Sequence, residues 1–244
     1  MDSNSMFATT LDMMIKGGPL MWPLLACSII GLTIIILKVI QFRKIQLGQV
    51  TFIQAIIRAV ARGHCKQAIE KLQQNPHPVA RIMKEAIAAG QDVTLTEEER
   101  NGRIARIGAM QIHKLESHLR GLEIVANVSP LIGLLGTVTG MIATFAALEA
   151  TGTKVDPAML AGGIREALVT TAFGLFIGIP TLAVFYIFEG RIERTRRLMQ
   201  HSATEILEYL NQRYRDALSE NLQLESPIFP SSARALVDSG LVKA

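Results

Sequence analysis

The chain has 244 residues, of which 49% are hydrophobic and only 5% aromatic, and it carries a net charge of +4 at pH 7. So many apolar residues exclude an ordinary soluble domain, and the basic segments show no recognised nucleic-acid motif, so no nucleic-acid partner is expected. The apolar residues gather in three blocks at 19–37, 124–148 and 167–188, each bounded by charges. Because a hydrocarbon core of ~30 Å takes ~20 helical residues, the predicted fold class is an all-α integral membrane protein. It has three transmembrane helices, two of them extended far into the cytoplasm, plus a cytoplasmic helical domain.

The first block is expected to be a retained membrane span. A cleaved signal peptide is the alternative, but its basic residues would precede the apolar run, whereas Lys38, Arg43 and Lys44 follow the run here. Excess Lys and Arg mark the cytoplasmic side of a span, and residues 1–18 contain only Lys16. The N-terminus is therefore expected outside the cytoplasm, and the basic residues after the third block place the C-terminus inside.

The same flanks divide the chain into domains. The expected boundaries are a periplasmic N-terminal segment at 1–18, transmembrane helices at 19–37, 122–148 and 166–188, a cytoplasmic helical domain at 38–121, a periplasmic loop at 149–165, and a cytoplasmic helix and tail at 189–244. Apolar residues at helical spacing predict cytoplasmic helices at 50–62, 66–74 and 79–89. Gly63 is expected to end the first of these helices and Gly90 the third.

Two longer helices are also predicted. Thr96 and Glu99 have the spacing of a capping box at a helix start, and only Pro130 interrupts the pattern that follows. We therefore expect a single helix from Glu97 to Leu148, about 78 Å long at 1.5 Å per residue. The third span is expected to continue into the cytoplasm to about Asn221.

The sequence offers no signature of enzymatic chemistry. Neither Cys27 nor Cys65 lies in a metal-ligand or redox spacing. No HExxH sequence occurs, and no serine within a span has an evident base nearby. We therefore expect no catalytic residue, no metal site and no cofactor, and we do not expect an enzyme.

Small and polar residues line one face of the second and third spans. On the second span they fall within an arc of about 80° at 100° per residue, and they are Ser129, Gly133, Thr137, Gly140 and Thr144. The third span carries a similar set, namely Glu166, Thr170, Gly174 and Thr181, with Thr171 beside them. The pairs Gly136/Gly140 and Gly174/Gly178 have the spacing that lets helices approach closely. Helix packing accounts for the glycines on its own.

Glu166 indicates a role other than helix packing. A carboxylate at or just inside the membrane boundary is costly to bury and usually marks an ion path, a relay or a partner charge. The alternative is an interface residue paired with Arg165 of a neighbouring chain, since adjacent residues on one helix do not face each other. Hydroxyls can hold water or pass protons, so the hydroxyl-lined faces of both spans favour a polar lumen with Glu166 at its mouth.

Two motifs in these spans carry a family resemblance. Ser129 to Met141 reads SPLIGLLGTVTGM, and Gly162 to Leu175 reads GGIREALVTTAFGL, followed by Ile179-Pro180. Together they closely resemble the ExbB/TolQ branch of the MotA/TolQ/ExbB proton channel family. The motifs cover roughly residues 126–190, while residues 1–120 share only the layout of spans, and three spans favour this branch over the flagellar-motor branch with four.

The resemblance implies a pentamer in a bacterial inner membrane whose second and third spans line a central pore. Two single-span partners of ExbD or TolR type, each with a membrane aspartate, would sit inside it, and proton flow would drive motion passed to a TonB- or TolA-like protein. The pore glutamate of the family maps onto Glu166, and its pore threonines onto Thr137 and Thr171. Two departures are Arg165, where a small residue is usual, and Phe185-Tyr186 in place of a Tyr-Asn pair.

The expected site therefore has three parts. The proton pathway and partner-helix contact comprise Glu166, Thr137, Thr171, Thr170 and Thr181; the pore-mouth charge is Arg165; the helix-packing residues are Gly133, Gly136, Gly140, Gly174 and Gly178. The predicted function is the pore-forming stator subunit of an energy-transducing complex driven by the proton-motive force, in contact with protons, the lipid bilayer and these partners. A non-conducting membrane scaffold for a single-span partner is the main alternative, and an intramembrane enzyme ranks last.

Overall fold

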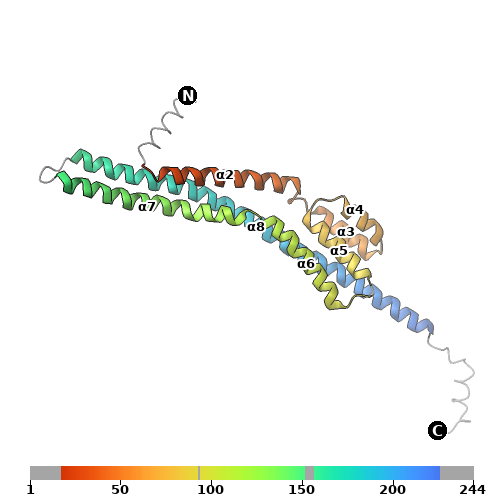
Figure 1. The fold of residues 1–244 in the computed structure, drawn as a ribbon. Helices are drawn as coiled ribbons and strands as arrows, with labels where there is room; N and C mark the ends of the chain where they lie inside the picture. The colour runs from red at the N-terminus through yellow and green to blue at the C-terminus, as the bar shows by residue number, and fades with distance from the viewer. Residues whose placement is uncertain (1–17, 93, 152–156, 226–244) are drawn as a thin grey trace, which may run out of the picture. The chain divides into compact units, whose positions relative to one another are not determined.

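A computed structural model describes residues 18–92, 94–151 and 157–225, and every regular element in those ranges is an α-helix (Figure 1). The helices fall into two compact units. Within the described residues, the first unit comprises 18–50, 76–78 and 106–198, and the second comprises 51–75, 79–92, 94–105 and 199–225.

The first unit contains the membrane helices. Three helices are long and apolar enough to cross a bilayer: α2 (Met21–Lys44), α7 (Leu119–Thr151) and α8 (Pro157–Glu225). Their apolar side chains are largely exposed, as Trp22 at 69% and Phe176 at 77% illustrate. Lipid can solvate such side chains where water cannot, and helices satisfy their own backbone groups in lipid. The predicted all-α membrane fold with three spans is confirmed.

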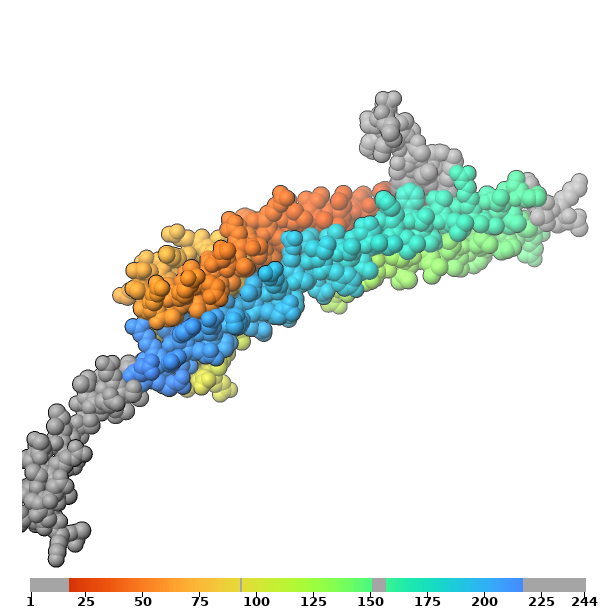
Figure 2. Space-filling model, turned by 180° about the vertical axis from the view of Figure 1, so that it is seen from behind, coloured from red at the N-terminus to blue at the C-terminus, as the bar shows by residue number. Residues whose placement is uncertain are grey.

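A narrow face of α2 packs on both other membrane helices. Its most buried residues include Leu24, Gly31 and Lys38, which follow one another at seven-residue intervals and so share one helix face. At the middle of this face, a Cβ on Gly31 would lie 3.2 Å from Val125 Cγ1 of α7 and 3.7 Å from Thr181 Oγ1 of α8. Figure 2 shows the side of this unit on which α8 runs alongside α2.

The helices reach further than the predicted spans. The segment 149–165 was expected to be a loop, but α7 continues to Thr151 and α8 begins at Pro157, while 152–156 lie outside the described residues. Proline suits the first position of a helix, where its missing N–H costs nothing, and the alanines that follow favour helix. At its other end α8 passes the expected Asn221 and reaches Glu225, which gives 69 residues, or roughly 100 Å at 1.5 Å per residue.

The prediction of one continuous helix from Glu97 to Leu148 is wrong. The chain instead forms α6 (Glu97–Glu116) and α7, separated at Ser117 and His118, and His118 has a left-handed φ of 64°. Pro130, the one proline of the predicted helix, lies inside α7. A hydrogen bond joins Ser117 Oγ and His118 Nδ1 at the break, 2.7 Å apart, and further stabilising groups come from α2.

Two side chains of α2 cap the end of α6. The last carbonyls of a helix have no partner within it. Lys38 Nζ donates a hydrogen bond to Leu115 O at 2.7 Å, and Gln41 Nε2 donates one to Lys114 O at 3.0 Å. Lys38 is only 1% exposed, and its positive charge suits the negative end of the α6 dipole. Lys38, predicted only as a basic flank, is a buried structural residue.

The second unit is a bundle of shorter helices. Its elements α3 (Thr51–Ala61), α4 (Cys65–Gln73) and α5 (Pro78–Gln91) lie close to the predicted ranges, and Gly63, with φ +85°, follows the first of them. Gly90 does not end its helix as predicted. It lies inside α5, where a Cβ would come 2.5 Å from Leu210 Cδ1 of α8, so the glycine serves close packing.

The predicted capping box at the start of α6 is present. The backbone N–H of Thr96 donates to Glu99 Oε2 at 2.9 Å, and the Glu99 N–H donates back to Thr96 Oγ1 at 3.3 Å. Hydrogen bonds from the Thr96 backbone and side chain hold the pKa of the Glu99 carboxyl below its usual range. The start of α6 was therefore readable from local sequence, whereas its end was not.

Candidate functional site

Small residues bring the backbones of α7 and α8 together. A Cβ on Gly174 would lie 2.6 Å from Ser129 O and 3.0 Å from Gly133 Cα, and one on Gly178 would lie 2.5 Å from Pro130 Cγ. Such distances leave no room for any side chain. Close backbone approach at small residues is how helices associate where lipid removes the hydrophobic drive between them.

The contact continues along both helices in antiparallel order. Moving up α7, a Cβ on Gly136 would meet Thr170 Cγ2 at 2.4 Å, and one on Gly140 would meet Ala167 Cβ at 3.0 Å. Further on, Thr144 fills the space beside a third glycine, Gly163 of α8. All five glycines predicted for helix packing, Gly133, Gly136, Gly140, Gly174 and Gly178, lie at this contact between two helices of one chain.

Of the hydroxyls on the two polar faces, most lie within the same contact, whereas that of Thr181 faces Gly31 of α2. Four of them each donate to the carbonyl four residues earlier on their own helix: Ser129 to Val125 O, Thr144 to Gly140 O, Thr170 to Glu166 O and Thr181 to Ile177 O. All four residues are at least nine-tenths buried. A hydroxyl that donates in this way still has lone pairs with which to accept.

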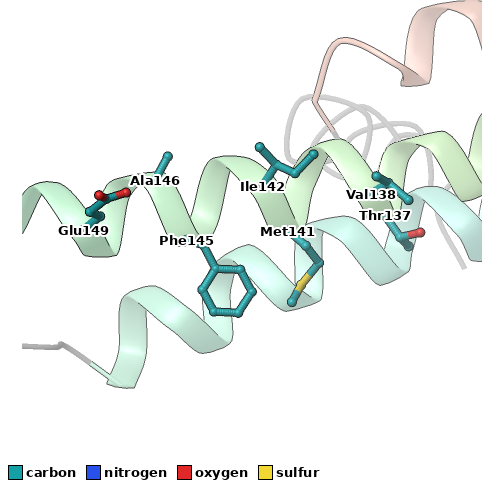
Figure 3. Close-up of a pocket in the computed structure, with 7 residues that line it drawn as sticks. All are labelled: Thr137, Val138, Met141, Ile142, Phe145, Ala146 and Glu149. Atoms are coloured by element: carbon teal, nitrogen blue, oxygen red, sulfur yellow. The ribbon is translucent and has the colours of Figure 1, made fainter.

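Thr171 and Thr137 differ from that set. Thr171 Oγ1 donates across the contact to Gly133 O of α7 at 2.7 Å. Thr137 donates to Leu134 O at 2.7 Å and begins an open hollow along α7. All residues lining that hollow come from α7: Thr137, Val138, Met141, Ile142, Phe145, Ala146 and Glu149 (Figure 3). On this face Val138, Ile142 and Phe145 are exposed, whereas Thr137 and Met141 are partly covered.

Glu166 lies at a second hollow, of about 270 Å³, where three elements meet. Its lining comes from the segment entering α2, from α7 and from α8: Gly18, Pro19, Leu20, Gly136, Thr139, Gly140, Ala143, Glu166, Ala167 and Thr170. The structure thus brings Glu166 and Thr170 together with Gly136 and Gly140. Thr137, Thr171 and Thr181 do not line this hollow, and the neighbouring Arg165 is exposed.

Several residues of this region were not predicted from the sequence pattern. Gly163 leaves space for Thr144 of α7, and Gly18 leaves space for Glu166 of α8. Neither role can be recognised without knowing which residues lie opposite. Thr139 was passed over because it falls outside the polar arc, although it lines the Glu166 hollow. Among the described residues, no cluster of three His, Cys, Asp or Glu side chains is placed to hold a metal ion.

The fold and the site define a helical membrane protein in which a carboxylate stands beside a closely packed, hydroxyl-bearing pair of helices. The chain belongs to the MotA/TolQ/ExbB proton channel family, whose profile matches residues 73–201. Relatives named ExbB and TolQ place it in the ExbB/TolQ branch, as predicted.

Three relatives illustrate the range of similarity. An ExbB-like 3 biopolymer transport protein of Synechocystis is 32% identical over 84% of this chain and 96% of its own length. An ExbB homolog of Methanothermobacter thermautotrophicus is 30% identical over 77% of this chain, but the match covers only 65% of that relative's length, slightly less than two thirds. The Tol-Pal system protein TolQ of Pseudomonas aeruginosa is 35% identical over 50% of this chain and 47% of its own length.

Proposed function

We propose that this chain is the pore-forming stator subunit of an ExbB/TolQ-type complex that is driven by the proton-motive force. The complex would be a homopentamer in a bacterial inner membrane, with the N-terminus periplasmic and the C-terminus cytoplasmic. Its partners would be an ExbD- or TolR-like single-span protein with a membrane aspartate and a TonB- or TolA-like transducer. Membership of the proton channel family supports the class of activity.

One observation carries the residue-level proposal. Glu166 stands at the edge of the apolar stretch of α8 and lines one hollow together with Thr139 and Thr170. Ionisable side chains in membrane segments are rare because burying them costs free energy, so a carboxylate at the end of an otherwise uncharged span indicates a functional site. In this proposal Glu166 accepts a proton from water on one side and releases it toward the carboxylate of the partner. Thr170, Thr171, Thr137 and Thr181 belong to the same pathway or to the partner-helix contact.

The surface available to a partner also fits. The α7 face that begins at Thr137 carries Met141 and Phe145, and among the described residues only those of α7 line its hollow (Figure 3). An apolar helix of a single-span partner or a neighbouring subunit would bury this face. The five glycines Gly133, Gly136, Gly140, Gly174 and Gly178 already lie at the contact between α7 and α8. In this proposal they hold the two helices in register while other faces make contacts between chains.

The test is Glu166→Gln, which keeps shape and hydrogen bonding but cannot ionise. We expect assembly with the partner to be retained and proton uptake by liposomes containing the complex to fall at least tenfold per assembled complex. Glu189→Gln is the matched control, because it is the same change on the same helix beyond the opposite end of the apolar stretch. Wild-type proton uptake in Glu166→Gln, normalised to assembled complex, would contradict the pathway role.

The scaffold alternative makes a different prediction in the same assay. A non-conducting scaffold would give no proton uptake with or without the partner, although the partner would still co-purify. An interface role for Glu166 predicts that Glu166→Gln assembles poorly but works normally per assembled complex. In that case Arg165→Gln combined with Glu166→Gln should restore assembly.

A further inference from the structure

The backbone just before α2 takes an unusual conformation. Gly18 has φ +72°, in the left-handed region, and its carbonyl accepts a hydrogen bond from the Met21 N–H at 3.2 Å. Glycine enters this region freely, whereas other residues are strained there. The turn at Gly18 brings the chain into the first turn of α2.

The same glycine faces the Glu166 carboxylate. A Cβ on Gly18 would lie 2.9 Å from Glu166 Oε1, closer than carbon and oxygen atoms of different residues normally come. The two residues line one hollow with Pro19 and Leu20. Any side chain at position 18 would therefore displace the Glu166 carboxylate.

The start of α2 lacks a negative group of its own. Leu20, at the cap position, makes no side-chain capping hydrogen bond, and the first turn contains no acidic residue. The N–H groups of a first helical turn have no partner within the helix, and a nearby carboxylate is favourable there. Glu166 brings a carboxylate from α8 to this end of α2.

We propose that Gly18 is a positioning residue for Glu166. By adding no side chain and by adopting the left-handed turn, it leaves the space beside the α2 N-terminus in which the carboxylate sits. The turn that leads into the first membrane helix thereby helps to set the position of the ionisable group. This inference rests on the proposed role of Glu166 in proton transfer.

The experiment compares three variants in complexes reconstituted into liposomes with the partner. Gly18→Ala adds a Cβ and strains the backbone. Gly18→Asn also adds a Cβ but tolerates the left-handed conformation better. Gly162→Ala is the control, because it lies one turn before Glu166 on α8 and its Cβ would meet no atom within 4 Å.

Two readouts are measured: proton uptake per assembled complex, and the rate at which dicyclohexylcarbodiimide modifies Glu166, followed by mass spectrometry. An ordinary separation of ~3.4 Å would require the carboxylate, now 2.9 Å from the added Cβ, to move by about 0.5 Å. Since a displacement of about 1 Å at a reacting group can cost roughly 100-fold, we expect Gly18→Ala and Gly18→Asn each to lower uptake about tenfold. Both should change the labelling rate and its pH dependence, and Gly162→Ala should change neither. The labelling readout does not need an active complex.

The possible outcomes distinguish the positioning role of Gly18 from the proposed role of Glu166. Wild-type uptake and labelling in Gly18→Ala and Gly18→Asn would overturn the positioning role while leaving the proposed function intact. Loss in Gly18→Ala with full recovery in Gly18→Asn would show that backbone strain alone matters, and it would also overturn the positioning role. Wild-type proton uptake in Glu166→Gln would instead overturn the proposed role of Glu166 in proton transfer, on which this inference rests.

Discussion

The contact between α7 and α8 is tight enough that one added methyl group should be measurable. In Gly174→Ala the new Cβ would lie 2.6 Å from Ser129 O and 3.0 Å from Gly133 Cα. Both neighbours are backbone atoms, which cannot swing aside as a side chain can. Reaching an ordinary separation of ~3.4 Å requires the two backbones to part by about 0.8 Å.

The cost follows from that displacement. Overpacking of this kind costs roughly 1–3 kcal/mol. The hydrogen bond from Thr171 Oγ1 to Gly133 O, 2.7 Å long, would lengthen to about 3.5 Å and add about 1 kcal/mol to the loss. Alanine is better than glycine in a helix by roughly 1 kcal/mol, so the net destabilisation expected is about 1–3 kcal/mol.

The assay is unfolding of the detergent-solubilised protein in a denaturant titration, followed by circular dichroism. The control is Gly190→Ala on the same helix, where a Cβ would meet no atom within 4 Å. That variant should gain up to roughly 1 kcal/mol from helix propensity alone. The two substitutions should therefore differ in sign, and a Gly174→Ala protein as stable as Gly190→Ala would refute the packing argument.

Three further predictions concern other parts of the chain. Reporter fusions at Gln91 and at the C-terminus should be active only with a cytoplasmic reporter, and periplasmic activity at Gln91 would reverse the proposed topology. Lys38→Met should remove the donor that caps α6 and speed amide hydrogen exchange in the last turn of α6, whereas Lys44→Met, at an exposed position, should not. Because the pKa of Glu99 is lowered, its contribution to the start of α6 is present above the ordinary carboxyl pKa and is lost as pH falls through the lowered value. Exchange of the Thr96 amide should accelerate over that range, and Thr96→Val, which keeps this amide but removes the hydroxyl, should reduce the pH effect.

Local patterns were enough to predict the elements but not all of their ends. The apolar blocks located the three membrane helices because span length is a property of the bilayer, and the Thr96 cap lies within four residues of its partner. The break at 117–118 was not predictable in that way. Its stabilising donors, Lys38 and Gln41, are more than 70 residues away in sequence.

The candidate site was likewise predicted only in part from the sequence. Spacing alone grouped the glycines and threonines onto faces, since a helix fixes which residues share a side. It could not say which face meets another helix of the same chain, and the contact between α7 and α8 uses most of the hydroxyls expected in the lumen. Nor could it relate Gly18 to Glu166, because only the packing of α2 against α8 brings them together.

Pro130 and Gly178 illustrate how such packing restricts the sequences this fold can accept. Proline has no N–H, so the Ala126 carbonyl one turn earlier lacks its usual helical donor. Gly178 brings the α8 backbone over that point, where a Cβ would lie 2.5 Å from Pro130 Cγ and 3.0 Å from Ala126 O. A larger residue at 178 would be tolerated only with a different residue at 130. Positions 130 and 178 should therefore vary jointly during evolution, as one unit of selection shared by two membrane helices.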